Sequence, residues 1–208
     1  GFYPEFDKLK LVTQCTADET LVLREYLAYQ LYHELTDHSF RTRLVRVRYV
    51  DAQDRLPARE QYAIVLEPDE EMAHRLGGEL LPGNHRLRAI NATHYQLLAV
   101  YQYMIGNTDW NLDKGHNIAL VRPPDGGAPV PVPYDFDYAG LTDAPYAKPH
   151  PQLPLDNVRQ RFFQYRGKNA DGLPATLQQF RDRKSDLINR VETLDGLTAA
   201  DKQEVRAY

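Results

Sequence analysis

The sequence predicts an α+β fold in which a small strand–helix–strand–strand unit precedes a mainly helical part. Residues 8–12 alternate polar and apolar side chains, as a half-buried strand does. Leucines at helical spacing follow, and Asp18 is a suitable N-cap for a helix over residues 19–34. Residues 43–50 alternate again, and after a turn the apolar residues 62–66 predict a returning strand.

The remaining residues contain longer helical patterns on both sides of a predicted β-hairpin. Glycines at 77–78 and 106 stand where helices are expected to end, because glycine readily adopts the left-handed backbone of a helix C-terminus. The expected elements are helices at 70–76, 89–104, 156–165 and 173–194, and strands at 117–121 and 130–134. We therefore expect residues 1–67 to form a small N-terminal part and residues 68–208 a larger, mainly helical part.

The composition excludes several classes of protein. A formal net charge of −4 leaves no excess of basic residues to neutralise phosphates, so we expect no nucleic-acid partner. No apolar run approaches the roughly 20 residues that a membrane-spanning helix needs. The single cysteine has no second cysteine for an internal disulfide. The chain begins with Gly1, so we expect that upstream residues were removed, and both a cytoplasmic and an exported location stay open.

Two polar segments carry the candidate chemistry. Residues 106–117 follow a predicted helix and contain Asp109 and Asn117, and residues 133–140 follow the hairpin and begin with the Pro-Tyr-Asp sequence that ends in Asp135. Because a hairpin brings the ends of its strands together, we expect Asp109, Asn117 and Asp135 to converge. Carboxylate and amide oxygens suit magnesium and its bound phosphates better than zinc. Phosphoryl transfer needs this set, with an acid to orient the attacking hydroxyl and ligands for the metal.

The same residues also have less specific interpretations. Aspartate and asparagine are common turn formers, so each segment alone is compatible with a structural loop. The order helix, polar loop, hairpin and acid favours a shared site, because two weak signals then predict one location. His116 is either a metal ligand in a hydrolase site or a partner in a structural hydrogen bond. Asn111 and Asn117 are both candidates for the amide ligand, and the position of Asn117 at the start of a strand favours it.

The two segments resemble parts of known kinases. Gly106-Asn107-Thr108-Asp109, with His116-Asn117 downstream, resembles the catalytic loop of HipA-type toxin kinases, although the loop is longer here. Pro133-Tyr134-Asp135 resembles the metal-binding acid segment of that group, and Asp135-Phe136-Asp137 is similar to the corresponding segment of the CotH-type spore-coat kinases. The resemblance implies an atypical protein-kinase-like fold with two lobes, of which the N-terminal lobe is reduced or truncated.

The resemblance also implies a role for each polar residue. Asp109 would be the catalytic acid that orients the acceptor hydroxyl. Asn117 would be a magnesium ligand and Asp135 the principal metal carboxylate. Asp137 stands where protein kinases usually have a glycine, and it would hold a second metal ion.

In the N-terminal part, the resemblance implies a lysine that holds the phosphates of ATP. Lys10 or Lys8 would have this role, with Glu25 of the following helix as its ion-pair partner. No glycine-rich phosphate loop occurs anywhere in the sequence. The implied function is transfer of a phosphoryl group from ATP, with Mg²⁺, to a hydroxyl of an unidentified protein. The alternatives are an inactive pseudokinase that serves as an interaction module and a metal-dependent hydrolase.

Overall fold

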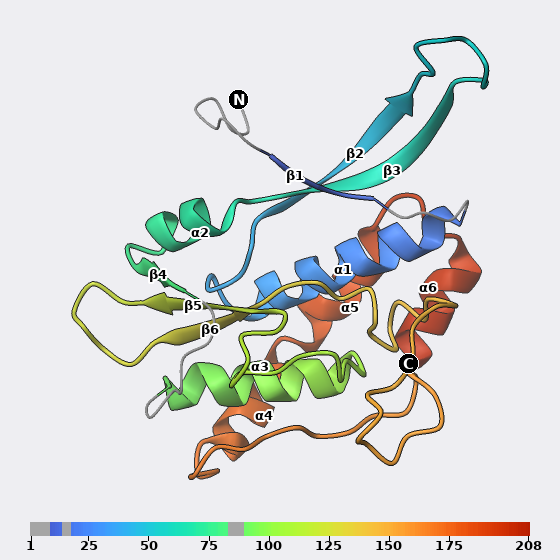
Figure 1. Cartoon of the computed structure of the whole chain (residues 1–208). Coiled ribbons are helices and arrows are strands. Elements are labelled where there is room, and N and C mark those ends of the chain that lie inside the picture. The colour runs from blue at the N-terminus through green and yellow to red at the C-terminus, as the bar shows by residue number, and fades with distance from the viewer. Residues whose placement is uncertain (1–8, 14–17, 83–89) are drawn as a thin grey trace.

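The computed structural model describes residues 9–13, 18–82 and 90–208, and within them the chain forms helices and two small antiparallel sheets. The predicted α+β class is therefore confirmed (Figure 1). The elements are β1 (Lys10–Val12), α1 (Glu19–Leu35), β2 (Thr42–Tyr49), β3 (Arg59–Leu66), α2 (Asp69–Arg75), β4 (Glu79–Leu81), α3 (Ala92–Met104), β5 (Ile118–Arg122), β6 (Val130–Pro133), α4 (Leu173–Asp182), α5 (Lys184–Thr193) and α6 (Ala199–Ala207). Lys8 lies outside the described residues.

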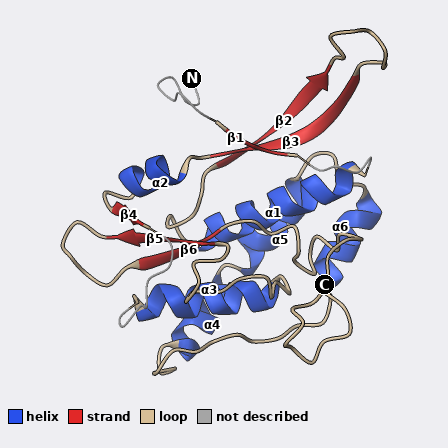
Figure 2. Ribbon diagram, in the orientation of Figure 1, coloured by secondary structure: helices blue, strands red, loops and turns tan. Residues whose placement is uncertain are grey.

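The first sheet has the strand order β1-β3-β2 and carries α1 on one side (Figure 2). β2 pairs with β3 along its whole length, from Thr42 opposite Leu66 to Tyr49 opposite Arg59. The far half of this hairpin extends away from the helices. The N-cap predicted for α1 is confirmed, because the Asp18 carboxylate accepts a hydrogen bond from the Thr20 N–H at 2.9 Å.

The second sheet has the order β4-β5-β6 and contains the predicted hairpin. β5 pairs with β6 from Ile118 opposite Pro133 to Val121 opposite Val130. This register places residue 117 and residue 134 at neighbouring strand ends, and the Tyr134 N–H donates to the carbonyl of Asn117 at 3.1 Å. The hairpin therefore brings the two polar segments to the same edge of the sheet.

The main core joins α1 to elements from the second half of the chain. α1 is buried along much of its length, and it packs against β3 on one side and α5 on another. The ring of Tyr32 lies 4.7 Å from that of Tyr101 in α3, and the buried Phe136 belongs to the same cluster. One core thus contains residues from both sides of position 67, and the division into parts 1–67 and 68–208 stays a prediction.

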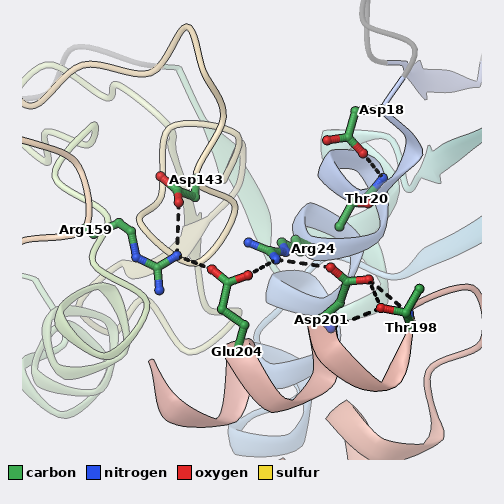
Figure 3. A network of polar contacts seen from close by, with 8 residues as sticks. All are labelled: Asp18, Thr20, Arg24, Asp143, Arg159, Thr198, Asp201 and Glu204. Atoms are coloured by element: carbon green, nitrogen blue, oxygen red, sulfur yellow. Dashed lines mark hydrogen bonds and ion pairs between the residues drawn. The ribbon is translucent and has the colours of Figure 1, made fainter.

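A network of ion pairs fixes α6 against α1 (Figure 3). Arg24 is 6% exposed, and its guanidinium contacts Glu204 at 2.7 Å and Asp201 at 3.5 Å. Glu204 also contacts Arg159 at 2.8 Å, and Arg159 contacts Asp143 at 3.1 Å. The network therefore extends from α1 through the C-terminal helix to the segment that follows residues 133–140.

The C-terminal third differs from the sequence prediction. The helix expected over residues 156–165 is wrong, because this segment is irregular. Its polar groups instead make tertiary contacts: the Arg161 side chain donates to the carbonyl of Met104 and the Gln164 amide donates to that of Thr108. The helix expected over residues 173–194 is divided at Arg183 into α4 and α5. In the described part of the chain, no helix has the length and apolar character needed to cross a membrane.

Candidate active site

The loop between α3 and β5 folds back on itself and places Asp109 beside His116 and Asn117. The Asn117 side-chain Nδ2 donates to the Asp109 carbonyl at 2.8 Å and to its carboxylate Oδ2 at 3.1 Å. The His116 Nε2 lies 3.0 Å from the other carboxylate oxygen, Oδ1. The Asp109 carboxylate is thus held between an amide and an imidazole. His116 was considered as a metal ligand or as a partner in a structural hydrogen bond, and the structure shows it hydrogen-bonded to Asp109.

Short-range hydrogen bonds of asparagine side chains shape this loop. Asn107 Oδ1 accepts from the Asp109 N–H at 2.9 Å, and Asn111 Oδ1 accepts from the Lys114 N–H at 2.9 Å. Such contacts stabilise turns, because they replace backbone hydrogen bonds that the loop lacks. Asn111 is thus engaged in the turn, whereas Asn117 reaches the Asp109 carboxylate.

The acid segment that follows β6 is anchored by aromatic residues from two helices. The Asp135 N–H donates to the Tyr29 hydroxyl of α1 at 2.8 Å. Phe136 is fully buried, and its ring lies 4.8 Å from Tyr29 and 5.9 Å from Tyr101 of α3. Burial, followed by the charge of Glu25, raises the pKa of Tyr29 well above 10.0, so its hydroxyl stays neutral at physiological pH. Sequence reasoning missed Tyr29, since nothing in the residues near it indicates contact with the acid segment.

The carboxylates of the two segments act on one another. The pKa of Asp137 is raised from 3.8 to about 6, first by burial and then by the charge of Asp135 and a hydrogen bond with its carboxylate. A hydrogen bond from Tyr146 acts in the opposite direction. The charge of Asp109 also raises the pKa of Asp137. Asp135 and Asp137 share a hydrogen bond, and Asp109 is close enough to raise the pKa of Asp137, so the three acids make a site of concentrated negative charge.

The backbone is strained at two of the candidate residues. Asn117 has a φ of 56° and Asp135 a φ of 62°, a left-handed conformation that costs residues with a side chain energy. Asparagine and aspartate tolerate this conformation better than most residues. Asn117 directly precedes β5 and Asp135 follows the end of β6 by two residues, so both strained residues flank the β5–β6 hairpin.

The far ends of the two polar segments are also joined. The Gly140 N–H donates to the Gly106 carbonyl at 3.2 Å, and the Leu141 N–H donates to the Ile105 carbonyl at 3.0 Å. Gly106 has a φ of 64°, and a Cβ atom there would overlap the hydroxyl of Tyr208. The two segments are therefore connected by the hairpin at one end and by this backbone pair at the other.

The predicted phosphate-binding residues lie on the first sheet and on α1. Lys10 is exposed on β1, and its Nζ lies 4.9 Å from the ring centroid of Tyr134, the residue before Asp135. Glu25 is 1% exposed and lies one helical turn before Tyr29. The structure thus brings Lys10 to the edge of the acid segment, and it places Glu25 on the buried face of α1, where its charge acts on Tyr29.

The donor atoms at the site suit a hard cation. Among the described residues, no group of three or more histidine, cysteine, aspartate and glutamate side chains has the arrangement of a metal site. Magnesium, however, is commonly bound by one or two carboxylates together with water and substrate phosphates. The Asn117 side chain donates to Asp109 through Nδ2, and its backbone carbonyl accepts from Tyr134, the residue before Asp135.

Known proteins provide no direct guide to the function of this site. No protein-family model matches the chain, and a search of curated proteins finds no relative. The function is therefore inferred from the arrangement of Asp109, Asn117, Asp135 and Asp137. That arrangement consists of clustered acids, an amide oxygen, and backbone strain at the residues that flank the hairpin.

Proposed function

We propose that the chain is a protein-kinase-like phosphotransferase that moves the γ-phosphoryl group of ATP to a hydroxyl of a protein. The observation that carries this proposal is the convergence of the two polar segments. Asp109 is hydrogen-bonded to Asn117, and its charge acts on Asp137, which shares a hydrogen bond with Asp135. Phosphoryl transfer requires an acid to orient the acceptor and oxygen ligands to neutralise phosphate charge, and these residues provide both.

In this proposal Asp109 accepts a hydrogen bond from the acceptor hydroxyl and orients its oxygen toward the phosphate. The hydrogen bonds from His116 and Asn117 fix the carboxylate for this task. Asn117, Asp135 and Asp137 would hold magnesium, which neutralises the negative charge of the phosphates when it is bound. Burial and then the charge of Asp135 raise the pKa of Asp137, and this supports a cation here, because a cation would stabilise the ionised carboxylate of Asp137.

The two-lobed kinase arrangement belongs to the same proposal. The order β1, α1, β2 and β3 is the order of elements expected for the small lobe of a kinase. Lys10 is close enough to Tyr134 for its ammonium to meet a phosphate placed at Asp135. We assign the phosphate-binding role to Lys10 on this basis, and its ion pair with Glu25 belongs to the same proposal.

A second candidate is a pseudokinase that binds nucleotide without transferring phosphate. The exposure of Lys10 favours it, because a solvated ammonium loses much of its attraction to phosphate through screening. In that case the acid segments would hold nucleotide and magnesium, and the protein would act by interaction with a partner.

Nucleotide-dependent thermal stabilisation, measured together with phosphate transfer, tests the proposal. ATP with Mg²⁺ should raise the melting temperature, because a ligand that binds only the folded state stabilises it. Asp135→Asn should remove the Mg²⁺-dependent part of this shift. Asp109→Asn should keep the shift and lose labelled phosphate transfer to proteins, including to itself. A stabilised wild type without transfer would favour the pseudokinase, and the absence of any shift with ATP and Mg²⁺ would end the proposal.

A further inference from the structure

A cavity of about 300 Å³ lies beside the loop that carries Asp109. Its lining comes from three places: the N-terminal end of α3, residues 110–113 of the loop, and residues 164–169 of the irregular segment. Pockets for small ligands have volumes from about 300 to 1,000 Å³, so the cavity has room for one or two side chains of a bound segment.

Specific hydrogen bonds hold the wall of this cavity in place. The Gln164 amide donates to the Thr108 carbonyl at 3.0 Å, which attaches residues 164–169 to the loop directly before Asp109. The Arg166 N–H donates to the Tyr95 hydroxyl of α3 at 3.1 Å. The irregular segment is therefore anchored on both the loop and the helix, and the cavity is a fixed feature of the fold.

The base of the cavity is aromatic. Tyr95 and Trp110 are 8% and 5% exposed, and their ring centroids are 6.4 Å apart with a nearly perpendicular orientation. The ring of Tyr165 lies 4.8 Å from that of Tyr95. Aromatic rings present apolar area with little conformational freedom to lose, which suits them to hold an apolar side chain.

The rim of the cavity is predominantly positive. Arg166 and Lys168 are both exposed, and no ion pair recorded between described residues includes either of them. Asp113 is the one acid among the lining residues. A ligand that places carboxylates at this rim is attracted by the positive charges of Arg166 and Lys168, which form no ion pair with a described residue.

We infer that this cavity binds a segment of the acceptor protein in which an apolar side chain is followed by acidic residues. This inference rests on the proposed function. Trp110 is the residue after Asp109, and an extended chain advances about 3.3–3.6 Å per residue. A segment whose hydroxyl lies at Asp109 therefore reaches the cavity within a few residues. The cavity would select the acceptor by what flanks its hydroxyl.

Trp110 provides a direct measurement, because it is the only tryptophan in the chain and it lines the cavity. The probes are two synthetic peptides, acetyl-Ser-Gly-Phe-Asp-Asp-amide and acetyl-Ser-Gly-Phe-Lys-Lys-amide, titrated without nucleotide while tryptophan emission is recorded. Calorimetric titration provides a second readout that does not depend on the indole. We expect the acidic peptide to change the emission with a defined dissociation constant and the basic peptide to bind more weakly by about ten-fold.

Matched charge reversals locate the binding. The double variant Arg166→Glu and Lys168→Glu should weaken binding of the acidic peptide by about ten-fold. The double variant Lys148→Glu and Lys184→Glu changes the net charge equally at exposed positions outside the cavity lining, and it should leave binding unchanged. Equal binding of both peptides, no binding by either readout, or an equal response to inorganic phosphate would overturn the inference.

The outcomes separate this inference from the proposed function. If ATP with Mg²⁺ stabilises the protein but the peptides do not bind, the phosphotransferase proposal stands and the cavity has no role in acceptor choice. If the acidic peptide binds but ATP with Mg²⁺ has no effect, the cavity is a peptide site and its assignment to an acceptor is wrong. The emission experiment contains no nucleotide, so neither result depends on the other.

Discussion

The hydroxyl of Tyr29 on α1 accepts a hydrogen bond from the backbone N–H of Asp135 at 2.8 Å. This contact joins the helix of the N-terminal unit to the residue that we propose as the principal metal carboxylate. It acts on the backbone of a residue whose φ of 62° is unfavourable, so it helps to hold the carboxylate where the second polar segment begins.

Replacing Tyr29 with phenylalanine removes this hydrogen bond and keeps the aromatic packing on Phe136. We expect the free energy of unfolding to fall by about 1 kcal/mol and the stabilisation by ATP with Mg²⁺ to decrease. Tyr32→Phe is the matched control, because the buried Tyr32 hydroxyl has no hydrogen-bond partner among the described residues. Urea unfolding with and without ligand measures both effects. An unchanged ligand shift in Tyr29→Phe would show that this contact does not position Asp135.

Two substitutions at Asn117 separate backbone strain from side-chain chemistry. Alanine there keeps the φ of 56° without the compensating hydrogen bonds to Asp109, and we expect a loss of about 1–3 kcal/mol in the free energy of unfolding. Glycine adopts this conformation without strain and should cost less. Both variants should lose the Mg²⁺-dependent stabilisation to the same extent, since both lack the amide oxygen. A ligand shift retained in Asn117→Gly would exclude Asn117 as a metal ligand.

The raised pKa of Asp137 predicts a specific pH dependence. In the unfolded chain this carboxyl ionises near 3.8, and in the folded protein near 6, so the folded state binds more protons between these values. The contribution of Asp137 to the free energy of unfolding is therefore highest at low pH, and it is lost as the pH rises toward 6. Asp137→Asn should stabilise the ligand-free protein at pH 7 and have little effect at about pH 4.

The difference between wild type and Asp137→Asn across this pH range isolates the group from other acids that titrate there. Melting temperatures measured without divalent cations give the difference directly. Addition of Mg²⁺ and ATP should reduce it at pH 7, because a cation would favour the ionised carboxylate. Parallel profiles for the two proteins would contradict the raised pKa of Asp137, to which burial contributes most and Asp135 next.

The ion-pair network around Arg24 predicts unequal effects of removing Glu204 and of removing Arg24 itself. Glu204→Ala leaves the buried guanidinium of Arg24 with only the longer contact to Asp201, and we expect a loss of about 1–3 kcal/mol in the free energy of unfolding. Arg24→Met removes the buried charge itself and should cost less. Arg206→Met is the control on the same helix, because its pair with Glu192 is exposed and should contribute little. A larger loss for Arg24→Met than for Glu204→Ala would contradict the expected cost of an unpaired buried charge.

Local patterns in the sequence predicted the elements whose signals lie within a few residues. The alternation at 43–50 and the helical leucines after Asp18 correspond to β2 and α1, with bounds that differ by one residue at one or both ends. β4 was not predicted, because its three residues become a strand only by pairing with β5, which is distant in the sequence. α6 was also missed, although its capping box of Thr198 and Asp201 is a recognisable signal.

Tertiary contacts explain where the sequence prediction was wrong or incomplete. The aromatic and basic residues of 156–165 resemble an amphipathic helix, but Gln164 and Arg161 bond to carbonyls of the preceding helix and loop. At the site, the proximity of Asn117 to the segment of Asp135 follows from the hairpin that was predicted, whereas Asp109 reaches Asn117 because the loop folds back on itself. The contact of Tyr29 with Asp135 depends on how α1 packs in the core, and this information is not local in the sequence.

The connection of the two polar segments at both ends determines which changes of chain length the molecule tolerates. The hairpin turn around Gly126 lies at the tip away from Asn117, and a side chain added at Gly126 would meet no atom within 4 Å. Insertions at this turn would therefore leave the acids in register. An insertion between Gly106 and Asp109 would instead shift the acid relative to the Gly106–Gly140 backbone pair. Distant relatives are consequently expected to vary in the separation between Asp109 and Asp135, while the spacing within each segment is kept.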